Sequence, residues 1–292
     1  MTAQLLDGRQ LAFRMREEMI REIADLREQI GKVPSLVNLI IGDSDGSTTY
    51  ANAQQRIAQQ LGVQYQLVRL PQDIELTAVL DKIFQWNQDP HISGIMIHKP
   101  LPEGMVYQTL ANALDPVKDI EGVHVVNLGR VLLGEERMVP CTATAVMELL
   151  RQSGVDLHGK EAVIVGASEI VGKPLTLLLL REWATVTVCH IATDEAGHLF
   201  EHVGRADVLV VAVGQAGLIK GSWIKPNAVV VDVGINRIGG KLTGDVEFST
   251  ASKRAAFITP VPGGVGPVTV MALFRNSLEA FARQHGLRKG ND

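Results

Sequence analysis

The chain has 292 residues, of which 46% are hydrophobic, and its formal net charge is −4 at pH 7. This length suits two domains that each bury a core of their own. No run approaches the roughly 20 apolar residues that cross a bilayer, and we expect no signal peptide at the N-terminus. The weak negative charge favours neither nucleic acid nor membrane as a partner. We expect a cytoplasmic protein in which Cys141 and Cys189 are reduced thiols.

The first part of the chain alternates between helical and strand patterns. Apolar residues recur every three or four positions between 11 and 30, which predicts an amphipathic helix. Strands are predicted at 35–42, 65–70 and 92–98, with helices at 48–61 and 75–86 between them. This β-α-β-α-β order predicts a parallel sheet covered by helices.

A second alternation follows residues 116–139, which carry little periodicity and are predicted to join two domains. Strands are predicted at 161–166, 185–190, 207–213 and 228–234, with helices at 142–152, after 173 and at 268–284. The pattern is typical of a dinucleotide-binding sheet. The predicted fold class is α/β, with an N-terminal three-layer α/β domain and a Rossmann-like dinucleotide-binding domain, both with parallel sheets. The expected domains are 1–139 with 268–292, and 140–267.

A glycine-rich turn joins the strand at 161–166 to the next helix, and it reads GASEIVGKP from Gly166 to Pro174. Glycines in a strand-to-helix turn let backbone amides approach a pyrophosphate, and the helix N-terminus adds partial positive charge. The spacing is not the usual GxGxxG, and an ordinary βα turn is the alternative. Because the turn opens a βαβ unit, we interpret it as a cofactor loop.

The strand at 185–190 is predicted to end beside the adenosine ribose of the cofactor. An arginine there favours the 2′-phosphate of NADP, whereas an acid favours NAD. The chain continues with residues 190–193, which contain no arginine or lysine, and then with Asp194 and Glu195. The cofactor is therefore predicted to be NAD or NADP, with NAD favoured.

Three further segments carry a family resemblance: KDIEG from Lys118, DVGIN from Asp232, and PVPGGVGP from Pro260. Together with the glycine loop, and in this order, they closely resemble the methylenetetrahydrofolate dehydrogenase/cyclohydrolase family. The resemblance runs from about Leu6 to the last helix. It implies an N-terminal catalytic domain completed by the last helix, a C-terminal cofactor domain, folate in the cleft between them, and a homodimer.

The resemblance also implies site residues. The predicted cofactor contacts are Gly166, Ala167, Ser168, Gly172, Ile191, Gly214 and Ile235. The predicted substrate contacts are Tyr50, Glu121, Pro262, Gly263 and Gly264, and the predicted catalytic residues are Tyr50, Gln54 and His98. Glycines in the PGGVGP loop suit a close approach of backbone to a flat ligand, and its prolines keep that backbone stiff.

Several of these positions depart from the family pattern. The family motif is Tyr-x-x-x-Lys, which places both side chains on one helical face, but Tyr50 is followed here by Gln54. His98 and Lys99 replace glutamine and leucine, and Glu121 replaces a pterin-binding aspartate. The segment Cys141–Ala145 reads CTATA where the family has Cys-Thr-Pro-x-Gly. These changes cluster around one pocket while the scaffold motifs remain.

The two reactions of the family place different demands on these residues. Hydride transfer mainly needs donor and acceptor to be positioned, whereas opening the methenyl ring needs a general acid–base. A lysine with a lowered pKa can do this and Gln54 cannot, so the sequence argues against cyclohydrolase activity and much less against dehydrogenase activity. His98 has a pKa near 6.5 when unperturbed and is the candidate substitute, although we favour a hydrogen-bonded spacer.

Three alternatives stay open. The first is a bifunctional enzyme that uses His98 for proton transfer. The second is a non-catalytic paralogue that binds nucleotide or folate, and the third is a dehydrogenase of another pterin carrier, which Glu121 suggests. A histidine pair in HLFEH, from His198 to His202, matches a metallopeptidase spacing. We interpret it as a solvated helix face and expect no metal.

Overall fold

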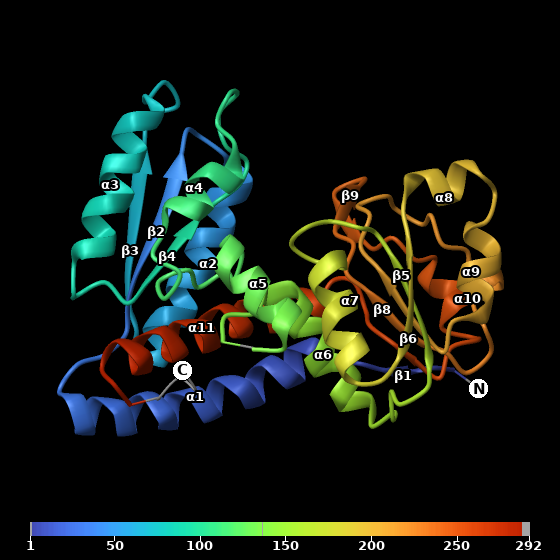
Figure 1. The fold of residues 1–292 in the computed structure, drawn as a ribbon. Coiled ribbons are helices and arrows are strands. Elements are labelled where there is room, and N and C mark those ends of the chain that lie inside the picture. The colour runs from blue at the N-terminus through green and yellow to red at the C-terminus, as the bar shows by residue number, and fades with distance from the viewer. Residues whose placement is uncertain (1, 136, 288–292) are drawn as a thin grey trace. The chain divides into compact units, whose positions relative to one another are not determined.

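The computed structural model describes residues 2–135 and 137–287 (Figure 1). The chain separates into two compact units. Unit 1 holds the residues up to Phe13 and Pro140–Ala272, and unit 2 holds Arg14–Val139 and the residues from Leu273 onward. Two helices, α1 (Gly8–Ile30) and α11 (Val265–Gln284), each begin in unit 1 and continue in unit 2. None of the described helices is long and apolar enough to cross a membrane.

Unit 2 contains a three-stranded parallel sheet of β2 (Ser35–Ile41), β3 (Gln64–Leu70) and β4 (Gly94–Ile97), in the order β3-β2-β4. Its further helices are α2 (Asp45–Leu61), α3 (Leu76–Gln88), α4 (Tyr107–Ala113) and α5 (Val125–Leu133). On one face of the sheet, Val37, Leu39 and Ile41 pack in a core that α3 and α4 complete. The strand register places Asn38 and Met96 on the other face, toward α2.

Two local features of unit 2 differ from the sequence prediction. Helix α2 begins at Asp45 rather than at 48, because Ser44 caps it and accepts a hydrogen bond from the N–H of Ser47. Helices α4 and α5 were not predicted, and α5 lies inside the segment expected to be a linker. His124 caps α5 by accepting from the N–H of Val126, a local signal that apolar periodicity does not contain.

Unit 1 contains a six-stranded sheet in the order β1-β11-β8-β7-β5-β6, and all its strand pairs are parallel. The strands are β1 (Gln4–Leu5), β5 (Glu161–Val165), β6 (Thr185–Cys189), β7 (Val208–Val211), β8 (Val229–Asp232) and β11 (Phe257–Ile258). A short antiparallel hairpin joins β9 (Asn236–Ile238) to β10 (Lys241–Thr243).

Helices cover both faces of this sheet (Figure 1). One face carries α6 (Cys141–Ser153) and α7 (Gly172–Arg181), and the other carries α9 (Leu199–Arg205), the short turn Gly221–Trp223 and α10 (Phe248–Ala251). The short helix α8 (Ile191–Glu195) follows β6. This doubly wound parallel sheet agrees with the predicted fold class.

The N-terminal residues lie with unit 1 and not, as the expected domain 1–139 had it, with the first sheet. β1 pairs in parallel with β11, and the N–H of Leu6 donates to the carbonyl of Ile258 at 2.9 Å. A two-residue strand carries almost no sequence signal of its own, so this pairing depends on a partner more than 250 residues away in the chain.

Candidate active site

The glycine loop of unit 1 lies where the strand order of the sheet reverses. β5 is the first strand of the repeat and has β6 on one side and β7 on the other, so their carboxyl ends form the switch point at which such sheets bind ligands. Gly166 has a φ of +122°, and a Cβ added to it would overlap the carbonyl oxygen of Ala212. A Cβ on Gly172 would overlap the carbonyl of Gly166. The backbone here is packed too closely for any side chain, as a pyrophosphate cradle requires.

The other predicted cofactor residues lie in the same loop or after the neighbouring strands. The carbonyl of Ser168, next to Ala167, accepts a hydrogen bond of 3.0 Å from the N–H of Lys173 at the start of α7. Ile191 begins α8 after β6 and is 75% exposed. Gly214 follows β7 with a φ of +69°. The predicted cofactor residues Gly166, Ile191 and Gly214 therefore follow the carboxyl ends of three adjacent strands.

The buried carboxylate of Asp245 joins the segment at 213–214 to Asn236, and the sequence did not predict this role. Asp245 accepts hydrogen bonds from the N–H groups of Val213 and Gly214, at 2.8 and 2.9 Å, and from the side chain of Asn236 at 2.8 Å. Asp232 in turn accepts from the N–H groups of Gly234, Asp245 and Val246. Burial raises the pKa of Asp232 to about 6, and these hydrogen bonds oppose the rise.

We expect the Asp245→Asn variant to bind the cofactor more weakly and to be less stable. An asparagine has one acceptor oxygen, so it cannot serve both the loop at 213–214 and Asn236, and bonds to a charged group contribute about 1.5–3 kcal/mol each. The measurement is the KM for the cofactor together with thermal unfolding. Asn236→Ala removes only one of the three hydrogen bonds to Asp245 and serves as the milder control. Unchanged KM and stability in Asp245→Asn would exclude this role.

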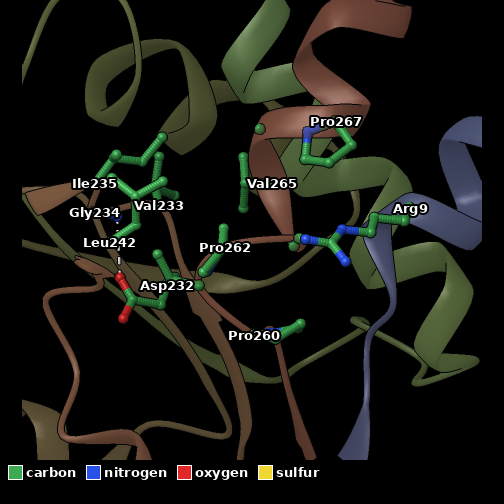
Figure 2. Close-up of a pocket in the computed structure, with 14 residues that line it drawn as sticks. Arg9, Asp232, Val233, Gly234, Ile235, Leu242, Pro260, Pro262, Val265 and Pro267 are labelled. Carbon is green, nitrogen blue, oxygen red and sulfur yellow. Dashed lines mark hydrogen bonds between the residues drawn. The ribbon is translucent and has the colours of Figure 1, made fainter. Parts of the chain in front are cut away.

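The loop 260–267 lines a small cavity in unit 1 (Figure 2). Its volume is about 160 Å³, and its walls also include residues 232–235, Leu242 and Arg9. Figure 2 shows the guanidinium group of Arg9 pointing toward the loop near Pro262. The N–H of Arg9 donates to the carbonyl of Gly263, which has a φ of +110°. The predicted substrate residues Pro262, Gly263 and Gly264 and the exposed Ile235 therefore share one cavity.

In unit 2, the predicted site residues gather at the carboxyl end of β4. The ring of Tyr50 on α2 meets the ring of His98 edge to face, with 6.0 Å between centroids. The hydroxyl of Ser47, one turn earlier on the same helix, donates to the carbonyl of Lys99 at 2.9 Å. Tyr50 is 38% exposed and can meet a ligand, whereas His98 is 3% exposed.

Gln54 is fully buried. Its side-chain oxygen accepts from the hydroxyl of Tyr65 at 3.1 Å, and its Nε2 donates to the sulfur of Met96 at 3.3 Å. Sequence spacing correctly put Tyr50 and Gln54 on one helix. It did not indicate that partners from β3 and β4 would hold the amide in the core, because those contacts join separate strands.

Glu121 lies next to the same strand end. Its Oε2 accepts from the hydroxyl of Tyr107 at 3.0 Å and from the N–H of Ile97 at 3.3 Å. Burial raises the pKa of Glu121 to about 7, and the hydrogen bond from Tyr107 opposes the rise. The ammonium group of Lys99 lies 4.5 Å from the centre of the Tyr107 ring. Burial thus favours the neutral, protonated form of this carboxyl.

The neighbouring motif residues Lys118 and Asp119 stabilise the fold. The Lys118 ammonium donates to the carbonyls of Trp86, Asn87 and Asp89 at the C-terminus of α3. Asp119 is buried and accepts from the N–H groups of Gly122 and His124 and from the Asn127 amide. These bonds fix the turn that carries Glu121.

His98 is held neutral by its surroundings. Burial, and secondarily the charge of Arg69, lowers the pKa of His98 from 6.5 to about 4. Its Nε2 has no hydrogen-bond partner among the described residues. A free imidazole takes up a proton below pH 6.5, so the unfolded chain binds this proton before the folded chain does. The stability that neutral His98 contributes is therefore present above pH 6.5 and is lost as the pH falls toward 4.

We expect His98→Gln to reduce the loss of stability between pH 6.5 and pH 4.5 by roughly 2 kcal/mol, because glutamine does not titrate. Urea unfolding at the two pH values measures the effect. His158→Gln, which replaces an exposed histidine, is the matched control. A His98→Gln profile parallel to the wild type would show that His98 titrates normally.

His198 and His202 lie at the start and in the last turn of α9. His198 is near Glu201. Within residues 2–135 and 137–287, no group of three histidine, cysteine or acidic side chains is placed to hold a metal ion.

Unit 1 thus has the architecture of a doubly wound nucleotide-binding unit, and unit 2 carries a group of polar and titratable residues near the carboxyl end of β4. The tetrahydrofolate dehydrogenase/cyclohydrolase NAD(P)-binding domain matches residues 140–285, and the catalytic domain of the same family matches residues 6–121. The chain belongs to the tetrahydrofolate dehydrogenase/cyclohydrolase family.

Relatives match along almost the whole chain. It is 43% identical to the "Bifunctional protein FolD" of Bacillus subtilis, over 97% of this chain and 99% of that protein. It is 46% identical to "Bifunctional protein FolD 2" of Myxococcus xanthus, over 97% of each. The structure of methylenetetrahydrofolate dehydrogenase-cyclohydrolase from Trypanosoma brucei, complexed with NADP cofactor and inhibitor, superposes with a TM-score of 0.93 at 38% identity, covering 99% of this chain and 100% of that one.

A solved structure that is described as a dehydrogenase alone also superposes on this chain. The structure of a methylenetetrahydrofolate dehydrogenase from the silkworm Bombyx mori has a TM-score of 0.91 at 34% identity and covers 97% of this chain and 99% of that one.

Proposed function

We propose that this protein is a methylenetetrahydrofolate dehydrogenase that oxidises 5,10-methylene- to 5,10-methenyltetrahydrofolate and has little cyclohydrolase activity. The observation that carries the proposal is the buried amide of Gln54, tied to Tyr65 and Met96 in a chain of this family. The position from which a lysine would move protons holds a group without acid–base chemistry, while the glycine loop of unit 1 is intact.

The residues of each unit have separate tasks in this reaction. The amides of the loop at Gly166–Gly172 bind the pyrophosphate of the cofactor, which fits because a side chain at either glycine would overlap backbone. The bound nicotinamide supplies the hydride acceptor. In unit 2, Tyr50 is exposed enough to orient the one-carbon centre, and the carboxyl of Glu121 binds the pterin. No protein proton donor is needed for hydride loss, since the folate nitrogens stabilise the cation.

Water attack on the methenyl carbon, by contrast, needs proton transfer that the folate nitrogens do not supply. It needs a group that gives and takes a proton near neutral pH, a contribution of about 10²–10⁴ in rate. Gln54 does not titrate, and Tyr65 beside it stays neutral because burial, and then Tyr50, raises its pKa. Position 54 therefore contributes no proton transfer to hydrolysis. Glu121, whose pKa burial raises to about 7, is held by Tyr107 and by the N–H of Ile97, and we assign it to binding the pterin.

The bifunctional enzyme is the second candidate, and the names of the Bacillus and Myxococcus relatives favour it. In this chain His98 would move the proton, as a neutral imidazole whose pKa is about 4. Such an imidazole is a weak base but is fully unprotonated at pH 7. A His98→Ala variant that keeps the cyclohydrolase rate would eliminate this candidate, whereas a loss of that rate without a loss of dehydrogenase rate would support it.

We propose NAD as the preferred cofactor. The residues that follow β6, from His190 to Thr193, include no arginine or lysine, and Asp194 lies in the first turn of α8. In the glycine loop, Glu169 pairs with Lys173 at 3.6 Å, so this cation is already partly neutralised. A 2′-phosphate would meet negative charge here, and kcat/KM for NAD should exceed that for NADP.

A two-step assay tests the proposal. Purified protein is given methylenetetrahydrofolate with NAD or NADP, and reduced cofactor and methenyl intermediate are followed separately. Reduced cofactor with accumulating methenyl intermediate is expected. Intermediate that decays faster with enzyme than without it would favour the bifunctional enzyme. Absence of reduced cofactor with both dinucleotides would leave the binding paralogue or another pterin carrier. The homodimer stays a prediction from the resemblance, and the cytoplasmic location stays a prediction from the sequence.

A further inference from the structure

Unit 2 contains a cavity of its own, at the opposite end of its sheet from His98 and Glu121. It lies where β2, β3 and β4 begin, and its volume is about 430 Å³. Small-molecule sites typically measure about 300–1,000 Å³. The lining includes Ser93, just before β4, and four basic side chains, Arg27, Lys32, His91 and His285. None of the described lining residues is acidic.

The basic side chains come from separate parts of the chain. Arg27 lies in the last turn of α1, Lys32 follows that helix, His91 precedes β4, and His285 follows α11. Neither Arg27 nor Lys32 has an ion-pair partner within the described residues. The cavity lining therefore carries two positive charges and no carboxylate that would neutralise them.

Helix C-termini offer a simpler explanation for these cations. Helices α1, α2 and α11 all end at this edge, and basic side chains stabilise the partial negative charge of such ends. However, backbone bonds already cap the ends: Gly31 donates to Arg27, Val63 to Ala58, and Leu287 to Ala282. Each terminus carries only about half a charge, so capping does not use all of the positive charge present.

Two further side chains add polar atoms to the cavity lining, Ser93 and His285. Ser93 is 3% exposed, and its Oγ accepts from the N–H of Ser35 at 3.0 Å. Its hydroxyl proton has no acceptor among the described residues. Nδ1 of His285 lies 2.9 Å from the carbonyl of Phe281, so this nitrogen carries the hydrogen and Nε2 is left for a ligand. In this tautomer Nε2 is an acceptor, and only the imidazolium form would donate from it to an anion.

We propose that this cavity binds the phosphate group of a small metabolite. Guanidinium, ammonium, imidazole and hydroxyl donors around one space suit a tetrahedral dianion with many acceptor positions. The cavity is larger than a single phosphate, so free phosphate and a nucleoside phosphate are both candidate sources. The site is separate from the chemistry proposed above, because it uses the amino ends of the strands whose carboxyl ends carry the candidate active site.

Calorimetric titration of the full chain with inorganic phosphate and with adenosine diphosphate tests the proposal, with saturating NAD present to fill unit 1. Wild-type protein is expected to bind at least one probe. The Arg27→Gln/Lys32→Gln variant should weaken that binding at least about tenfold, a loss of about 1.4 kcal/mol. Tighter binding of the diphosphate would identify a nucleotide site, and equal binding would identify a phosphate site.

A matched variant controls for the change in net charge. Arg14→Gln/Lys82→Gln removes one arginine and one lysine from unit 2, outside the cavity lining, and should bind both probes like the wild type. Equal weakening in both double variants would show that only general charge matters. That result, or no binding to either probe up to about 10 mM, would overturn the proposal.

Discussion

Replacing Gln54 by lysine is expected to raise the cyclohydrolase rate by about 10²-fold or more while the dehydrogenase rate changes little. A lysine there follows Tyr50 by one helical turn and shares its face of α2. The site is fully buried, and its partners Tyr65 and Met96 are neutral, so desolvation would lower the lysine pKa toward neutrality. A neutral amine at pH 7 is the general base that hydrolysis lacks.

The same burial predicts a cost in stability for Gln54→Lys, because an ammonium without a carboxylate partner is unfavourable in a protein core. Thermal unfolding must therefore show that the variant is folded at the assay temperature. Gln54→Met is the matched control: it has similar length and no amine, and it should keep the wild-type rate of methenyl decay. A rise of equal size in both variants would mean that cavity shape, not proton transfer, limits hydrolysis.

The sequence predicted the parts of this site that depend on local spacing. The strand–glycine–helix order around Gly166 and the helix that carries Tyr50 both follow from residues close together in the chain. The early start of α2 depends on the side chain of Ser44, and α5 depends on His124 as a cap. Such single hydrogen bonds leave little trace in a hydrophobic pattern, which is why the sequence predicts only a linker at 116–139.

The remaining features depend on contacts between distant segments. Asp245 reaches the loop at Val213 across 32 residues, and nothing in the local sequence marks it as a carboxylate that orders a cofactor loop. Tyr65 acts on Gln54 from a neighbouring strand, so the departure at position 54 was visible in the sequence but its burial was not. The pKa values of His98 and Glu121 likewise follow from burial, which only the packed structure defines.

Gly166→Ala is expected to abolish cofactor binding at ordinary concentrations, with a loss of affinity of at least about 100-fold, or about 2.7 kcal/mol. The methyl group would overlap the carbonyl oxygen of Ala212, and the φ of +122° is one that alanine rarely adopts. Relief requires β5 and β7 to separate at their carboxyl ends, where the pyrophosphate is predicted to bind. Fluorescence titration with NAD and NADP, together with thermal unfolding, measures both effects.

Gly159→Ala separates steric overlap from backbone strain alone. Gly159 has a φ of +70° and lies before the other end of β5, where an added Cβ would meet nothing within 4 Å. Its replacement should cost about 1 kcal/mol of stability and leave cofactor affinity unchanged, because only the left-handed conformation is penalised. If the two variants lost affinity alike, the switch-point position of Gly166 would be irrelevant, and the cofactor would have to bind elsewhere in unit 1. A loss confined to Gly166→Ala ties dinucleotide binding to the close approach of β5 and β7.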